Sequence, residues 1–286
     1  MVRGMTKPSS RPGSSTEVTP SDDRDARLQS FPFRAGDIVI STPAKCGTTW
    51  LQMICALLVF QTPELPRPLY ELSPPLTHSF DELAAQRHRR FIKTHVALDG
   101  LPLRPDVHYI VVGRHPLDQT VSLFYQDLNF ENEGPAPALE DWLHARCHGE
   151  GPLKDLDNLD GVMWHLYYAW TLRTRPNVLL THYDDLSADL DGEMRRIAAW
   201  LGVTVPGEIW PGLVQAATFD RMKSRATDLA PAHRILKDPS AFFRRGRSGS
   251  GRELLTERDL AAYRARTKAL APADFLAWLH RDTPAA

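Results

Sequence analysis

The sequence is poor in cysteine and contains no long hydrophobic run. Its three cysteines, Cys46, Cys55 and Cys147, form an odd set without paired spacing, which offers no disulfide framework and favours a reducing compartment. No segment has the length and continuous apolarity of a membrane span, and the first residues lack the apolar core of a signal peptide. We therefore predict a cytoplasmic protein with no integral membrane segment.

A net charge of either sign is lacking as well. The 286 residues carry 34 basic and 35 acidic side chains, which gives a formal net charge of -1. Proteins that bind nucleic acids or anionic membranes through general electrostatic attraction have a large basic excess. We expect no nucleic-acid partner, and any site for an anion must be local.

The chain is hydrophobic enough to fold, except at its start. The hydrophobic content is 42%, which suffices for one large core. Residues 1–28 are instead rich in Ser, Pro, Thr and charged residues, and they have too little apolar surface to offset the entropy lost on ordering. We predict a disordered N-terminal arm over 1–28 and one domain over 29–286.

Strand and helix patterns alternate along this domain. Short apolar runs typical of buried strands occur at 38–40, 91–95, 109–112 and 177–180. Helical patterns occur at 48–60, 79–88, 117–128, 139–147, 162–173 and 189–201. The proline-rich stretch 62–76 predicts a surface loop. The alternation predicts an α/β fold, a single three-layer domain with a central parallel sheet and helices on both faces.

The turn after the first strand has the composition of an anion site. It carries Lys45 and Gly47 and leads into a helix that begins at Thr48. The first amides of a helix have no intrahelical partner and the helix dipole adds positive charge, so a phosphate is the natural occupant. An ordinary turn with threonine N-caps also fits this stretch alone. The GxxxxGK[ST] pattern is not met, because no glycine lies five residues before Gly47 and the lysine precedes that glycine.

Polar residues follow the other predicted strands. His95, Arg114 and Tyr183 stand at the ends of the second, third and fourth strands. In a parallel sheet these ends meet at one edge, which is where open α/β sheets bind their ligands. We expect the three side chains to share one site with Lys45.

Two motifs at these strand ends resemble those of a known family. They are Lys93-Thr94-His95 and Lys45-Cys46-Gly47-Thr48-Thr49-Trp50. They are similar to the KTH strand end and the KSGTTW loop of the sulfotransferases that use 3'-phosphoadenosine 5'-phosphosulfate (PAPS), particularly the cytosolic type and its actinobacterial glycolipid and aryl relatives. The resemblance runs from about Phe31 to Thr256, and it implies a P-loop-like turn for the phosphosulfate.

Four further segments follow in the order of this family. Arg114 and Ser122, eight residues apart, match the family's pair for the 3'-phosphate, and Tyr183 matches the tyrosine after the later strand. The segments that resemble those near the adenine and over the 3'-phosphate contain Thr218, Phe219, Met222, Phe242, Phe243, Arg244, Arg245 and Gly246.

The resemblance implies a role for each group of residues. Lys45 and the amides of residues 46–49 would hold the phosphosulfate, Lys93 would assist, and His95 would accept the proton of an acceptor hydroxyl. The 3'-phosphate and the adenine ring would be held by two sets of side chains: Arg114, Ser122, Arg244 and Arg245 for the phosphate, and Trp50 with Phe219 for the ring.

The implied cosubstrate is PAPS and the implied product is 3',5'-ADP (PAP). The acceptor would be a small-molecule or lipid-borne hydroxyl on a phenol, alcohol or glycolipid. No metal is expected, because lysine and backbone amides already neutralise the leaving group. His144, Cys147 and His148 have helical spacing suited to a metal, but the sequence shows no fourth ligand, so we interpret them as a solvated helix end.

The chain departs from the family pattern at several positions. Pro43-Ala44 replaces Tyr-Pro before the lysine, Cys46 replaces a serine, and Ala217 replaces a threonine near the adenine. The dimer motif of animal members survives only as Arg252 and Thr256. We predict a monomer or a dimer, without assuming the animal type of dimer.

Two other functions fit parts of the sequence. A P-loop phosphoryl-transfer enzyme would need its lysine after the glycine and a metal-binding aspartate at a strand end, and neither is visible. A non-catalytic nucleotide-binding module would keep the phosphate-binding residues without needing His95.

Overall fold

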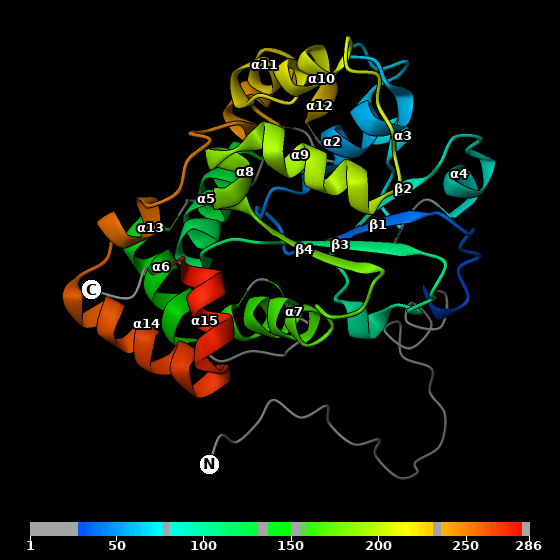
Figure 1. The fold of residues 1–286 in the computed structure, drawn as a ribbon. Helices are drawn as coiled ribbons and strands as arrows, with labels where there is room; N and C mark the ends of the chain where they lie inside the picture. The colour runs from blue at the N-terminus through cyan, green and yellow to red at the C-terminus, as the bar shows by residue number, and fades with distance from the viewer. Residues whose placement is uncertain are drawn as a thin grey trace.

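The computed structural model describes residues 28–76, 80–130, 137–149, 156, 158–230 and 236–281 (Figure 1). Nearly all of the predicted N-terminal arm lies outside these residues, and so does Ser79, the first residue of the helix expected over 79–88. Leu28 and the segment that follows it belong to the folded domain, since Leu28 is buried in the core.

The sheet has four strands, and every neighbouring pair is parallel. Their order across the sheet is β2-β1-β3-β4. The strands are β1 (Ile38–Ser41), β2 (Phe91–Thr94), β3 (His108–Gly113) and β4 (Val178–His182). The predicted α/β fold with a parallel sheet is therefore confirmed.

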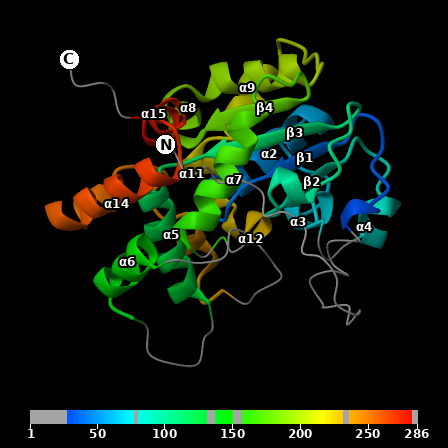
Figure 2. The ribbon, with the colours of Figure 1, turned by 90° about the horizontal axis from the view of Figure 1, so that it is seen from below.

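Helices cover both faces of the sheet, as Figures 1 and 2 show. One face carries α2 (Thr48–Phe60), α3 (Leu69–Leu72), α9 (Leu190–Trp200), α10 (Trp210–Ala216), α11 (Phe219–Ser224) and α12 (Ala226–Leu229). The other face carries α7 (Leu159–Thr171), α14 (Glu257–Leu270) and α15 (Ala273–His280). The remaining helices are α4 (Phe80–Ala85), α5 (Pro116–Asn129), α6 (Leu139–His148), α8 (Tyr183–Ala188) and α13 (Ser250–Glu253).

Residues of the strands alternate between two hydrophobic cores. Ile38 and Ile40 pack with the α2 layer, whereas Val39 between them packs with the α7 layer. All three side chains are fully buried. A strand covered on both faces gains no benefit from polar residues at alternate positions, which explains its continuous apolar run.

Several element boundaries differ from the prediction. β2 ends at Thr94, so His95 follows the strand and is not part of it. The proline-rich stretch is not all loop, because Leu69 and Leu72 are buried and form the ends of the short helix α3. The helix predicted from 189 begins one residue later, since the Asp189 carboxylate caps it by accepting from the amide of Gly192 at 2.9 Å.

Candidate active site

The carboxyl edge of the sheet opens into a pocket. β1 leads into α2 through the loop that carries Lys45, and β3 and β4 lead directly to Arg114 and Tyr183. The described residues that line the pocket are Ala44, Lys45, Gly47, Thr48, Thr49, Trp50, Lys93, His95, Arg114, Ser122, Gln126, Tyr183, Phe219, Met222, Phe242, Phe243, Arg244, Arg245, Gly246 and Arg247. Side chains from all four strand ends are thus brought to one site, as the sequence predicted.

The loop between β1 and α2 needs unusual backbone angles. Lys45 has φ 65° and Gly47 has φ 103°. A Cβ atom on Gly47 would lie 3.2 Å from Cδ2 of Tyr183, so this position requires glycine for two reasons. The strained conformation of Lys45 turns the chain into the start of α2.

Gly47→Ala should lower the free energy of unfolding by about 1–2 kcal/mol for the left-handed backbone, plus the cost of moving Tyr183. A matched control is Gly202→Ala, because Gly202 also has a positive φ of 64° but no atom lies within 4 Å of the position that its Cβ would occupy. Urea unfolding of both variants measures the difference. Equal destabilisation would show that the contact with Tyr183 adds nothing.

The first turn of α2 has no side-chain cap. Gly47 occupies the N-cap position, and the threonine caps considered from the sequence are absent. The Thr48 hydroxyl instead lies 2.5 Å from the Thr42 hydroxyl. The first amides of the helix therefore point at the pocket without a side-chain acceptor, as at other helix ends that bind anions.

Two lysines that line the pocket have a lowered affinity for protons. The pKa of Lys45 is lowered to about 7, mainly by burial and then by the nearby charges of Arg114, Lys93 and Arg244. Burial also lowers the pKa of Lys93 to about 8. Such a cluster of cations is unfavourable by itself, and a bound anion would relieve the repulsion.

Three arginines of the pocket are not ion-paired with any carboxylate that the structure describes. Within the described part of the chain, no carboxylate forms an ion pair with Arg114, Arg244 or Arg245. The Nε atoms of Arg114 and Arg244 are buried, and no described residue accepts a hydrogen bond from them. Buried guanidinium groups are normally satisfied, so these atoms mark where an acceptor with several oxygens would bind.

Arg114 is held in place by the loop between β1 and α2. Its Nη1 donates to the backbone oxygen of Lys45 at 2.7 Å, and its guanidinium lies 4.2 Å from the centre of the Tyr183 ring. Tyr183 in turn packs edge-on against Trp50, whose Nε1 donates to the oxygen of Ala217 at 2.8 Å. These contacts link Arg114 after β3, Tyr183 after β4 and Trp50 on α2.

His95 lies at the end of β2 with a defined tautomer. Its Nδ1 is 2.7 Å from the backbone oxygen of Thr42. A carbonyl oxygen can only accept, so Nδ1 carries the proton and Nε2 holds the lone pair. His95 lines the same pocket as Lys45 and Lys93, and Nε2 is the atom that can act as a base.

A loop from the C-terminal third covers the pocket. The Phe242 ring centre lies 4.0 Å from Nζ of Lys45. The backbone at Gly246, with φ 66°, passes so close to Phe219 that a Cβ there would lie 2.5 Å from the ring. Residues 242–247 thus bring two adjacent aromatic rings, and the arginines that follow them, to the pocket.

The chain after this loop is anchored to α5. The Asp118 carboxylate accepts from the amide of Gly249 at 2.9 Å and from the amide of Gly251 at 2.8 Å. Asp118 and Ser122 lie one turn apart on α5, so the same helix presents the pocket serine and holds the loop.

Two predicted site residues do not line the pocket. The Cys46 side chain is fully buried, burial raises its thiol pKa to about 12, and its amide makes a long 3.4 Å hydrogen bond to the oxygen of Pro43. Thr218 is the N-cap of α11, where its hydroxyl accepts from the amide of Arg221. Neither side chain therefore lines the pocket. Cys46 belongs to the loop between β1 and α2, and Thr218 caps α11.

Sequence reasoning missed three residues that line the pocket, Ala44, Gln126 and Arg247. Gln126 follows Ser122 by four residues on α5, so helical spacing could have placed the two on one face. Arg247 directly follows the predicted loop segment. Ala44 lies in the loop before Lys45, and its oxygen accepts from Nε2 of Gln119 at 3.0 Å.

The fold and the site define an α/β protein with an anion-binding turn at the carboxyl edge of a parallel sheet. The chain belongs to the sulfotransferase domain family, which matches residues 35–274. A glycolipid sulfotransferase of Mycobacterium tuberculosis (strain ATCC 25177 / H37Ra) is 39% identical over an alignment covering 89% of this chain and 90% of that protein. Human sulfotransferase 1C2 is 24% identical, with 82% of each chain covered.

Solved structures show the same fold. Mouse sulfotransferase SULT7A1 complexed with PAP has a TM-score of 0.71 and 23% identity, with 92% of this chain and 95% of that chain covered. Retinol dehydratase in complex with androsterone and inactive cofactor PAP has a TM-score of 0.69 and 20% identity, with 92% and 86% covered. The family predicted from the sequence is confirmed by the match over residues 35–274 and by the relative at 39% identity. No helix in the described ranges has the length and apolarity needed to cross a membrane.

Proposed function

We propose that the protein transfers a sulfuryl group from PAPS to the hydroxyl of a lipid-borne or small-molecule acceptor. The observation that carries the proposal is the pocket's cluster of lysines and arginines. Among the described residues, no carboxylate forms an ion pair with this cluster. Two buried guanidinium Nε atoms in it have no hydrogen-bond partner among these residues. A nucleotide with a 5'-phosphosulfate and a 3'-phosphate would supply anionic groups at both ends of this pocket. The aromatic residues Trp50 and Phe219 supply apolar surface for its adenine ring.

In this proposal each end of the nucleotide has its own partners. Lys45, Lys93 and the first amides of α2 bind the 5'-phosphosulfate, while Arg114, Ser122, Arg244 and Arg245 bind the 3'-phosphate. PAPS supplies an activated sulfuryl group whose S–O bond to the 5'-phosphate breaks during transfer. The protein's residues position this group and neutralise charge on the leaving phosphate oxygen.

His95 is proposed as the base. Its Nε2 takes the proton of the acceptor hydroxyl as the new O–S bond forms, and the electron pair of the broken S–O bond leaves with 3',5'-ADP. The hydrogen bond from Nδ1 to Thr42 holds the ring and stabilises the imidazolium that results.

A glycolipid acceptor is favoured over a simple phenol. The relative at 39% identity is named a glycolipid sulfotransferase, whereas the cytosolic sulfotransferases match at 24% to 28%. The proposal is tested by incubating the protein with PAPS and, in parallel, with a glycolipid extract, a phenol panel and a sterol panel, and by detecting products that gain one sulfuryl group by mass spectrometry. We expect 3',5'-ADP and a sulfated glycolipid to form in equal amounts. If no acceptor is sulfated although 3',5'-ADP binds, the protein is a nucleotide-binding module.

A phosphoryl-transfer enzyme fits the pocket less well. Among the described residues that line it there is no aspartate or glutamate, which is the usual protein ligand of a nucleotide-bound magnesium ion. The charged groups that the pocket offers are instead basic, which suits a reaction in which lysine and arginine provide the positive charge.

Nucleotide affinity should depend on pH through the two lysines. Below about pH 7 both amines are charged before the nucleotide binds, and affinity is highest. As the pH rises through about 7 for Lys45 and about 8 for Lys93, binding must take up a proton at each amine. The affinity for 3',5'-ADP then falls by up to about tenfold per pH unit for each group.

Calorimetric titration with 3',5'-ADP in two buffers of different protonation enthalpy measures this proton uptake directly. Uptake that increases from about pH 7 to about pH 9 is expected. Release of protons, or an affinity that does not change over this range, would contradict the assignment of the lysines to the phosphosulfate.

A further inference from the structure

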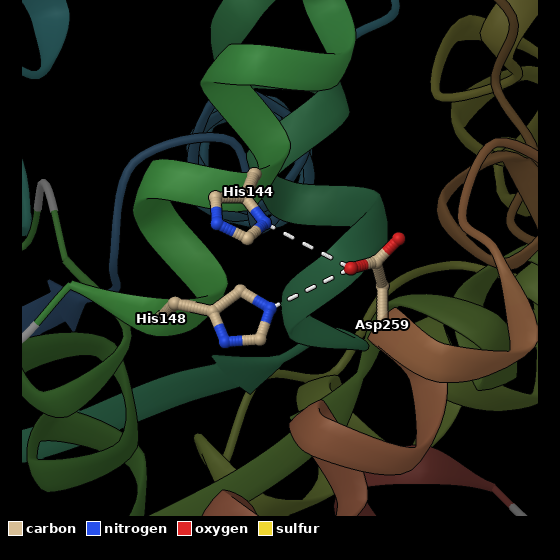
Figure 3. A group of neighbouring side chains, drawn as sticks. All are labelled: His144, His148 and Asp259. Carbon is tan, nitrogen blue, oxygen red and sulfur yellow. Dashed lines mark ion pairs between the residues drawn. The ribbon is translucent and has the colours of Figure 1, made fainter.

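A second cluster of chemically active side chains lies on the surface between α6 and α14. His144 and His148 come from α6, and Asp259 comes from the first turn of α14 (Figure 3). The two helices pack against each other, although Asp259 is more than a hundred residues from either histidine in the sequence. None of the three residues lines the pocket described above.

All three side chains converge on one point. The two histidines lie one helical turn apart, with ring centres 4.3 Å from each other. Nδ1 of His144 is 3.8 Å, and Nε2 of His148 is 3.6 Å, from the same carboxylate oxygen, Oδ1 of Asp259. Figure 3 shows both rings turned toward this oxygen.

These separations are close to those around a bound metal ion. Ligand atoms about 2.0–2.1 Å from a tetrahedral ion lie about 3.3 Å from one another. In the cluster, the three candidate ligand atoms all lie within 4.8 Å of one another. Small rotations of the exposed histidine rings would bring every ligand into range without moving either helix.

The carboxylate is already oriented by a neighbouring residue. Its second oxygen, Oδ2, accepts from the Thr256 hydroxyl at 2.5 Å, and Thr256 is the N-cap of α14. Oδ1 is left facing the histidines. Hydrogen bonds of this kind to the outer oxygen of a ligand are typical of built metal sites, because they fix the ligand before the ion binds.

We propose that His144, His148 and Asp259 bind a divalent transition-metal ion of the zinc class. Two imidazole nitrogens and one carboxylate oxygen suit zinc, cobalt, nickel or copper, whereas magnesium and calcium require mostly oxygen ligands. The site is exposed to solvent, so water completes the coordination shell. The bound ion joins α6 to α14 and stabilises the packing of the C-terminal helices against the domain.

The proposal differs from the interpretation of His144, Cys147 and His148 as a solvated helix end, and the titration described below decides between the two. The sequence shows the histidine spacing but not the nearby carboxylate, because Asp259 approaches only through the packing of α14 on α6. The site is independent of the proposed sulfuryl transfer, in which no metal takes part.

Calorimetric titration of the untagged, chelator-treated protein with zinc chloride tests the site. One saturable site is expected in the wild type, with a zinc-dependent rise in melting temperature and no such rise with magnesium chloride. His148→Ala and Asp259→Asn should each weaken zinc binding by more than about tenfold. Cobalt bound to the wild type should also give the absorption bands of a site with nitrogen and oxygen ligands.

A matched control is Glu257→Gln, which removes an exposed carboxylate from the same turn of α14 without touching the cluster. It should bind zinc like the wild type. The proposal is overturned if the wild type has no saturable site, or if His148→Ala binds zinc as tightly as the wild type. In either case the three residues form an ion-pair cluster only.

Discussion

Replacement of His95 by alanine is expected to lower turnover by about 100-fold to 10,000-fold, the usual contribution of a positioned general base. Affinity for 3',5'-ADP should stay at the wild-type level, because His95 is not among the residues proposed to bind the nucleotide's phosphates. The hydrogen bond from Nδ1 to Thr42 fixes the tautomer in which Nε2 is basic. Alanine removes the whole ring, and with it the hydrogen bond and the basic nitrogen. Steady-state kinetics together with calorimetric titration separate the two effects.

The matched control for this variant is His108→Ala. His108 is the first residue of β3 and lies at the amino end of the sheet, opposite the pocket. Its replacement should leave turnover of the folded protein unchanged. Wild-type turnover in His95→Ala would contradict the role of His95 as the base, and a parallel loss of nucleotide affinity would assign it to binding.

Lys45→Met should lower kcat/KM by about 100-fold to 1,000-fold, the cost of removing one group that stabilises charge in the transition state. Methionine keeps the length and apolar stem of the side chain and removes only its charge. The affinity for 3',5'-ADP should also fall, since the proposed binding mode places the ammonium against the same phosphate in the ground state.

The same variant should be more stable than the wild type at pH 7 and below. Burial and three neighbouring cations lower the pKa of Lys45 in the folded protein, so its charged form opposes folding. This penalty is complete below about pH 7 and fades as the pH rises toward 10.5, the ordinary pKa of a lysine. Relief of the penalty should raise the melting temperature by about 2–4 °C for each kcal/mol recovered. The lost contact with Phe242 offsets part of this gain.

Lys268→Met is the control, because Lys268 is exposed on α14. It should change neither activity nor melting temperature. A Lys45→Met variant that is both inactive and less stable would assign Lys45 to the structure of the loop, and an active variant would remove it from the mechanism.

The sequence predicts which strand-end residues share the pocket, because these residues directly follow recognisable strands. Lys45, His95, Arg114 and Tyr183 each follow a β-branched or apolar run that is recognisable on its own, and parallel strands necessarily bring these ends together. The resemblance to sulfotransferases added the more distant loop residues, such as Arg244. Neither periodicity nor composition would have placed that loop over the sheet.

Other features depend on tertiary packing and were not visible. The direction of the Cys46 side chain follows from the left-handed turn at Lys45 and Gly47, which sends the thiol into the core. The pairing of Asp259 with the histidines of α6 depends on the packing of α14 against α6. The short helix α3 exists because the fold buries Leu69 and Leu72, which local sequence preference does not reveal.

Discrimination between nucleotides tests the central claim most directly. The proposed site has one set of cations for the 5'-phosphate and a separate set, with Arg114 and Arg244, for the 3'-phosphate. Thermal shift and calorimetric titration with 3',5'-ADP, 5'-AMP and magnesium ATP compare the three ligands on the same protein. We predict clear stabilisation by 3',5'-ADP, much weaker stabilisation by 5'-AMP, and weakened 3',5'-ADP binding in Arg114→Ala. Stabilisation by magnesium ATP alone, with none by 3',5'-ADP, would contradict the account.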